Sequence, residues 1–245
     1  MDRCFTLAGY LKLIYEFWSL GYRCRRFVVG VPLPGDLFLR HDVDYCLRAA
    51  AAMADAEASI GISSTWFVLV RSPLFNPFGA DERELLRRLR HDGGAIGLHF
   101  DASYYQDQSV GALELAAAQE CTALVLASDG PVVAISFHKP PPALATLESH
   151  FAGLPHCSQP AFMRDSLYCS DTLARFGHGD PIVLARERAI PPVHLLTHPI
   201  WWTGDEDDDG LSKLDRFVEQ RELITTAAVA RSVTAFRMRL MEAAQ

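Results

Sequence analysis

The sequence predicts an α/β fold: a single-domain, distorted (β/α) barrel of about seven strands, laid out like a TIM barrel. Strand-like apolar segments alternate with helix-like segments, which favours parallel strands joined by right-handed helical crossovers. About seven such units fit into 245 residues, which favours a closed or nearly closed barrel over two domains. With 49% hydrophobic residues and a mean hydropathy of +0.07, the chain can bury a sizeable core.

Each predicted element depends on its periodicity and on the residues at its ends. Residues 6–20 carry apolar side chains at helical spacing, with Thr6 as a candidate cap and Gly21 as a stop signal. The β-branched and aromatic run 64–70 is typical of a strand. The same criteria predict strands at 36–44, 95–100, 132–138, 166–170 and 193–198, and helices at 46–59, 81–91, 110–127, 143–152, 211–221 and 223–242. We expect helix 6–20 and the C-terminal helices within 211–242 to pack on the barrel, so that residues 1–245 form one domain.

Composition restricts the class of protein. A net charge of -7 disfavours nucleic acid as a partner. The six cysteines form no Cys-x-x-Cys pair, which indicates reduced thiols and no disulfide framework. No basic leader with an apolar stretch opens the chain, and no segment reaches 18 consecutive apolar residues. We therefore expect a cytoplasmic protein without an integral membrane segment.

Four predicted strands end in Asp or His. Asp42 and Asp44 close the strand 36–44, and strand alternation places both carboxylates on one face. Two carboxylates at the rim of an apolar core repel each other and lose hydration, which is costly unless a cation lies between them. His99 lies next to the end of the strand 95–100, and His138 and His198 end the strands 132–138 and 193–198. In barrels of this kind the reactive groups lie at the C-terminal strand ends, so these residues predict one metal-competent site.

Five motifs carry a resemblance to a known family. They are Arg-His-Asp-Val-Asp at 40–44, Gly-Leu-His-Phe-Asp at 97–101, Ser-Phe-His-Lys-Pro at 136–140, Ser-Asp-Thr at 170–172 and Leu-Thr-His-Pro-Ile-Trp-Trp at 196–202. In this order they resemble the polysaccharide deacetylase superfamily (NodB homology, carbohydrate esterase family 4). The most similar branch opens with His-Asp-Val-Asp and closes with His-Pro-x-Trp-Trp, and the likeness runs from about residue 6 to residue 202.

The resemblance implies a distorted barrel with a divalent metal ion at its mouth, with zinc as the expected ion. It implies metal-assisted removal of an N-acetyl group from a sugar or glycan precursor, in surface polysaccharide or lipopolysaccharide biosynthesis. Asp42 would be the general base, and Asp44 and His99 would bind the metal. The family's second metal-binding histidine is missing, because Ser103 stands at its position. His138 is our first candidate replacement and Asp101, two residues from His99, is the second.

The remaining expected roles surround this centre. His198 matches the general acid of the last motif, and Asp171 is expected to orient it. Lys139 stands where the family has an arginine that orients the base, and it is a weaker bidentate partner. We place four residues at the substrate, where the two tryptophans could stack on a sugar ring: Lys139, Asp101, Trp201 and Trp202.

Structural alternatives stay open for these residues. Asp42 and Asp44 could cap the Ala-rich helix that follows, and His99 could be a core histidine bonded to the backbone. The two tryptophans could simply plug the barrel rim. The chain could also be a catalytically impaired barrel that binds glycan or assists assembly, or a metal hydrolase that cleaves an ester, another amide or a phosphoester.

Overall fold

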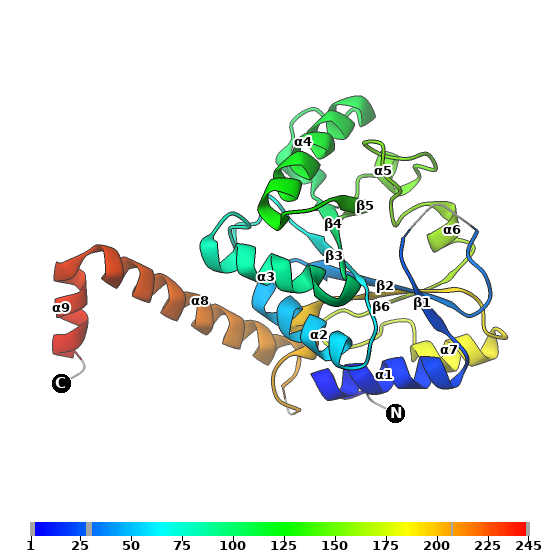
Figure 1. The fold of residues 1–245 in the computed structure, drawn as a ribbon, viewed down its shortest axis with the longest axis horizontal. Coiled ribbons are helices and arrows are strands. Elements are labelled where there is room, and N and C mark those ends of the chain that lie inside the picture. The colour runs from blue at the N-terminus through cyan, green and yellow to red at the C-terminus, as the bar shows by residue number, and fades with distance from the viewer. Residues whose placement is uncertain (1–2, 28–30, 207, 244–245) are drawn as a thin grey trace. The chain divides into compact units, whose positions relative to one another are not determined.

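The computed structural model describes residues 3–27, 31–206 and 208–243. Its centre is a seven-stranded sheet in the order β5-β4-β3-β2-β7-β6, with β1 beside β2. Every strand pair in it is parallel. With helices around the sheet (Figure 1), this is the distorted (β/α) barrel that the sequence predicts. The strands are β1 (Arg23–Arg25), β2 (Asp36–Val43), β3 (Thr65–Val68), β4 (Ala95–Phe100), β5 (Val132–Phe137), β6 (Leu167–Ser170) and β7 (Val193–Thr197).

Strand β2 organises the sheet. Its first residues pair with β1, its last residues pair with β3, and most of its length pairs with β7. The strands β5 and β6 share no ladder within the described ranges, so the ring of strands is open between them. An isolated bridge between Ile135 and His156 attaches the long β5–β6 connection to the edge of β5.

Within residues 3–206, helices lie before and between the strands and cover the sheet. In α1, the Thr6 hydroxyl accepts a hydrogen bond from the Gly9 amide, which confirms the expected cap. This helix buries Tyr10, Leu13, Ile14 and Phe17, which lie on one face at helical spacing. The helices are α1 (Leu7–Ser19), α2 (Leu47–Ser59), α3 (Ala80–Arg90), α4 (Val110–Ser128), α5 (Pro142–Ala145), α6 (Pro160–Met163), α7 (Pro181–Glu187), α8 (Gly210–Ser232) and α9 (Thr234–Ala243).

The expected helix 143–152 is wrong in its extent, because α5 ends at Ala145. Beyond it, Phe151 and Leu154 exchange backbone hydrogen bonds around a turn in which Ala152 is left-handed. The helix ends at its C-cap residue Thr146, whose φ of -104° and ψ of 5° leave the helical region. The elements β1, α6 and α7 were not predicted, since elements this short have almost no periodicity to read.

The chain divides into two compact units, Met1–Glu206 and Asp207–Gln245. The first unit contains the whole sheet. In the second, α8 starts at an Asp209 cap that accepts the Ser212 amide, and it continues to Ser232. The expected break at residue 222 is therefore absent, and the helices separate at Val233 instead. The packing of these helices on the barrel stays a prediction.

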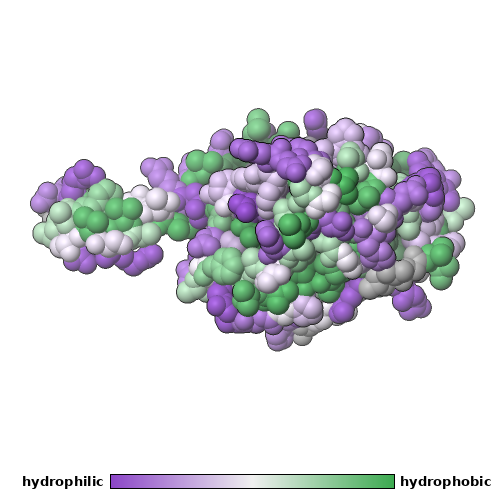
Figure 2. Space-filling view, turned by 90° about the horizontal axis from the view of Figure 1, so that it is seen from above, coloured by the Kyte–Doolittle hydropathy of each residue, from purple (hydrophilic) through white to green (hydrophobic). Residues whose placement is uncertain are grey.

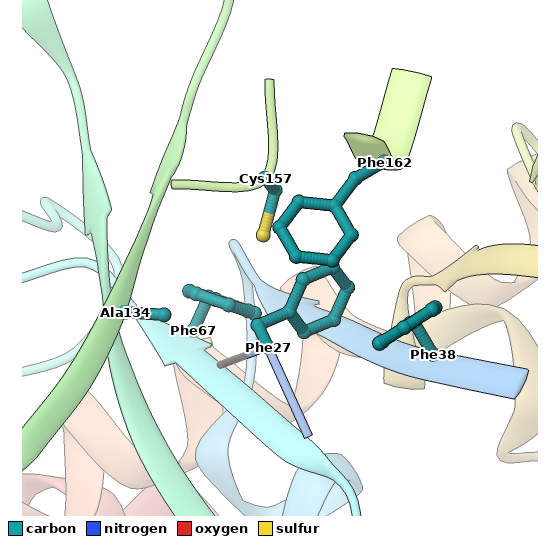
Figure 3. Close-up of a cluster of buried hydrophobic side chains, with 6 residues drawn as sticks. All are labelled: Phe27, Phe38, Phe67, Ala134, Cys157 and Phe162. Carbon is teal, nitrogen blue, oxygen red and sulfur yellow. The ribbon is translucent and has the colours of Figure 1, made fainter. Parts of the chain in front are cut away.

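Aromatic side chains fill the barrel below the strand ends. Figure 3 shows Phe27 between Phe38, Phe67 and Phe162, with ring centroids 5.5, 5.8 and 4.9 Å from it. Gly97 on β4 permits this packing, because a Cβ atom there would collide with the Phe67 ring. The aromatic layer thus requires glycine two residues before His99.

Helix α4 is long and apolar enough to cross a membrane, judged by length and composition alone. In the fold it lies beside β4, β5 and α3, as the covering helix of a βαβ unit does. Its exposed residues include Leu115 and Leu126. Hydrophobic patches alternate with hydrophilic ones on the face in Figure 2. The expected absence of a membrane segment stays a prediction.

Candidate metal centre

Four candidate residues lie at one edge of the parallel sheet, namely Asp44, His99, His138 and His198. Asp44 follows β2, His99 lies near the end of β4, His138 follows β5, and His198 follows β7. Carboxyl ends of parallel strands meet at the same edge, so residues far apart in sequence converge there. Three of these four residues, namely Asp44, His99 and His138, form a group whose ligand atoms all lie within 4.8 Å of one another.

The geometry of this group fits a single metal ion. His99 Nε2 lies 3.0 Å from Asp44 Oδ1 and 3.1 Å from His138 Nδ1, and His138 Nδ1 lies 3.8 Å from Asp44 Oδ1. A triangle with these sides has a circumscribed radius of about 2 Å, the length of a zinc–nitrogen or zinc–oxygen bond. One carboxylate and two imidazoles also form a donor set that zinc accepts while keeping a position open.

The protonation states of the group suit a cation. Asp44 Oδ1 is buried and makes no hydrogen bond, even though His99 Nε2 is only 3.0 Å away. Burial raises the pKa of Asp44, but the His99 and His198 charges outweigh burial and lower it. Burial and the neighbouring His99 lower the pKa of His138, so His138 is neutral at pH 7 and able to bind a metal. A buried carboxylate oxygen that makes no hydrogen bond and lies between two imidazole nitrogens is a suitable ligand for a cation.

Asp42 lies below the group and is fixed by Arg40. The guanidinium donates to both carboxylate oxygens, with Nε–Oδ1 and Nη2–Oδ2 distances of 2.8 and 2.7 Å. Both residues are buried. Burial would raise the pKa of Asp42, but the Arg40 charge outweighs it and holds this pKa well below its usual range. Sequence reasoning missed Arg40, although its place two residues before Asp42 on the same strand face was readable.

Ser136 joins Asp42 to the metal group. Its Oγ lies 2.6 Å from His99 Nδ1 and 3.3 Å from Asp42 Oδ1. A partner at Nδ1 fixes the orientation of the His99 ring and leaves Nε2 directed at the metal position. Ser136 is opposite His99 in the β4–β5 register, so only knowledge of that pairing could have identified it.

Asp171 lies within hydrogen-bonding distance of His198, the residue that we expect it to orient. His198 Nδ1 lies 2.6 Å from Asp171 Oδ1, and the His198 backbone amide donates to the same carboxylate. The Trp202 indole donates to Asp171 Oδ2 at 2.7 Å. Burial lowers the pKa of His198, but the hydrogen bond and charge of Asp171, with Asp42 and Asp44, outweigh it and raise this pKa to about 9. His198 therefore carries a proton at neutral pH in the metal-free protein.

The expected substrate residues separate into two groups. Lys139 is exposed at the strand end, and Asp101 is half-buried there, where its Oδ1 accepts the Ser103 amide. Trp202 is completely buried, so in this structure it supports Asp171 and offers no free face to a sugar. Trp201 is also buried, and its ring lies 5.9 Å from that of Tyr45.

A cavity of about 320 Å³ opens onto this site, within the size range of small-molecule sites. Its polar wall holds the metal group together with Arg40, Asp42, Lys139 and His198. The remaining lining residues are Phe137, Pro140, Ser158, Met163, Tyr168 and Leu196.

His41 faces the opposite side of β2 and takes no part in the site. Its Nδ1 lies 2.6 Å from Thr197 Oγ1 and its Nε2 lies 2.8 Å from Glu57 Oε1. Its ring stacks on Trp66 with a centroid distance of 4.2 Å. These contacts give His41 a structural role.

We expect Asp171→Asn to lower the pKa of His198 in the metal-free protein. The folded pKa of about 9 lies above the usual value of about 6.5, so the pair stabilises the fold fully below pH 6.5. That stabilisation, about 3 kcal/mol, is lost as the pH rises through 9. The stability gap between wild type and variant should therefore shrink from pH 6 to pH 10, measured by denaturant unfolding in chelator. Asp55→Asn, at an exposed site, is the control; parallel curves for Asp171→Asn and wild type would contradict the assignment.

No protein-family model matches this chain, and no curated protein matches it. Solved structures with a similar arrangement include a CE4 family pseudoenzyme from Bacillus anthracis, 11% identical with a TM-score of 0.40 over 76% of this chain and 60% of that one. This chain thus spans about 60% of that protein's length. A family 4 acetyl xylan esterase from Clostridium thermocellum, in complex with cobalt, is 12% identical with a TM-score of 0.41 over 76% and 83% of the two chains. The peptidoglycan deacetylase PdaC from Bacillus subtilis is 12% identical with a TM-score of 0.44 over 83% and 96%. These are distant likenesses, and they assign no activity to this chain.

Proposed function

We propose that this protein is a metal-dependent hydrolase that removes an N-acetyl group from a sugar or glycan precursor. The observation that carries the proposal is the triangle of Asp44, His99 and His138, whose ligand atoms fit one ion beside a cavity. We place the reaction in surface polysaccharide or lipopolysaccharide biosynthesis in the cytoplasm, with zinc as the ion.

The residues around the triangle supply the proton transfers of an amide hydrolysis. Asp44, His99 and His138 would hold a divalent ion, which would supply activation of water and polarisation of the acyl oxygen. Asp42 stays ionised because Arg40 holds it, so it can accept the proton of the attacking water. His198 carries a proton at neutral pH in the metal-free protein and would deliver a proton to the leaving amine. Asp171, 2.6 Å from His198 Nδ1, would hold the His198 ring in this orientation.

His138 replaces the missing second histidine of the resembling family. It directly follows β5, whereas Ser103, at the family's position, donates its amide to Asp101. Asp101 is not part of the group of ligand atoms. Among the two replacements that the sequence left open, the geometry favours His138.

The test is acetate release from a panel of N-acetylated amino sugars, before and after chelation and with metal restored. We expect release only with metal bound. His138→Ala should lose both stoichiometric metal and acetate release, because it removes one of three protein ligands. His150→Ala, at an exposed histidine of the β5–β6 connection, should keep both.

Metal-loaded protein that releases no acetate from any sugar of the panel would contradict this function. Adding acetyl esters and phosphoesters to the panel separates the remaining alternatives. Turnover of those compounds alone would indicate another hydrolase, and glycan binding without turnover would indicate an impaired barrel.

A further inference from the structure

Lys139 has an unusual backbone conformation at the mouth of the site. Its φ is +45°, in the left-handed region that side chains other than glycine rarely adopt. Pro140 follows it, and a residue before proline prefers extended backbone, so this conformation departs from two preferences at once. Strained residues can mark ligand-binding positions, and among the seven described residues other than glycine with positive φ, Lys139 is the one that lines this cavity.

Lys139 also has no partner within the protein. No hydrogen bond or ion pair engages its ammonium group in the part of the chain that the structure describes. It lines the same cavity as Asp42, Asp44 and His198. The role expected for it, orienting Asp42, is filled by Arg40 through two hydrogen bonds. Lys139 is therefore free to bind something that enters the cavity.

The charges of the cavity indicate what that ligand is. Arg40 offsets Asp42, and Asp171 offsets His198. The charges of Asp44, Lys139 and Asp101 are not offset in this way. Asp101 is counted here because its charge acts on His138. With a divalent ion on Asp44, the site carries a net positive charge although the whole chain carries -7. A positive cavity in an acidic protein favours an anionic ligand.

We propose that the substrate of this site carries an anionic group, a carboxylate or a phosphate, near its acetamido group, and that Lys139 binds this anion. The inference rests on the proposed deacetylase function and adds the charge class of the sugar. Lys139 is thereby a specificity-determining residue, distinct from the groups that transfer protons.

The test compares sugars that share the N-acetylglucosamine core and differ in whether they carry an anionic group. N-acetylglucosamine is the neutral member, N-acetylmuramic acid adds a carboxylate, and the 1- and 6-phosphates of N-acetylglucosamine add a phosphate. We expect kcat/KM of the metal-loaded protein to be on the order of 10- to 100-fold higher for at least one charged sugar. The carboxylate and phosphate arms then identify the anion.

Variants assign the preference to Lys139. Lys139→Gln should reduce the charged-to-neutral ratio of kcat/KM toward one, mainly by raising KM for the charged sugar. Lys139→Glu should bring the ratio below one. Lys12→Gln, the same substitution at an exposed lysine of α1, should leave the ratio unchanged.

Binding measurements keep this inference separate from the proposed function. If no sugar releases acetate, calorimetry of the same four sugars still compares wild type with Lys139→Gln. Tighter binding of a charged sugar that depends on Lys139 supports the inference even then. Equal kcat/KM and equal affinity for neutral and charged sugars in the wild type, or a preference that survives in Lys139→Gln, would overturn it.

Discussion

Replacing Asp42 with asparagine is expected to lower kcat by about two to four orders of magnitude while the protein keeps its metal. Asparagine has nearly the same shape but cannot accept the proton of the attacking water. Asp42 is outside the group of metal-ligating atoms, which consists of Asp44, His99 and His138. The measurement is steady-state acetate release together with metal content of the purified variant.

Asp44→Asn provides the opposite pattern, because it weakens a ligand of the ion and should lower metal content and turnover together. Asp165→Asn, at an exposed aspartate, should change neither. If Asp42→Asn loses its metal along with its activity, Asp42 is a ligand and the two roles are reversed. If kcat stays within tenfold of wild type, Asp42 is not the base.

Much of this site could be predicted from strand alternation and parallel strand pairing. Both can be recognised in short segments of sequence, and together they indicate which distant residues meet at one edge of the sheet. Asp42 and Asp44 share a face by the two-residue period. His99 and His138 reach the same edge because each ends a parallel strand. None of these inferences requires knowledge of the register between strands, so the sequence alone supports them.

What the sequence did not provide depends on register and on packing. Ser136 contacts both His99 and Asp42 only because β4 and β5 align at those residues. From the sequence, Trp202 could either stack on a sugar ring or fill the rim of the barrel. In the structure it is buried, because its indole donates to Asp171 and Tyr10 of α1 packs against its ring. The role of Arg40 was not predicted for two reasons. A buried arginine is costly without a charged partner, and the residue expected to orient Asp42 was Lys139.

Replacing Arg40 with leucine is expected to destabilise the protein by about 3–5 kcal/mol. Asp42 is 2% exposed and Arg40 is 6% exposed, so removal of the guanidinium leaves a buried carboxylate without its counter-charge. The guanidinium also lies 5.8 Å from the centre of the Phe67 ring, in the aromatic layer below the site. Denaturant unfolding at pH 7 measures the loss. Arg164→Leu, which removes an exposed ion pair with Asp165, should cost less than about 1 kcal/mol.

The double variant Arg40→Leu with Asp42→Leu tests the cause of this loss. Removing both charges eliminates the unpaired carboxylate, so most of the stability should return.

The pH dependence of the free energy of unfolding is a second test of the same cause. In the wild type Arg40 holds the pKa of Asp42 below its usual value of about 3.9, so the pair stabilises the fold above that pH and the contribution fades as the pH falls. In Arg40→Leu, burial raises the pKa of Asp42 instead, so the penalty should be smaller at pH 4 than at pH 7. A double variant as unstable as Arg40→Leu, or a penalty independent of pH, would show that Arg40 acts through packing and that Asp42 owes its ionised state to other groups.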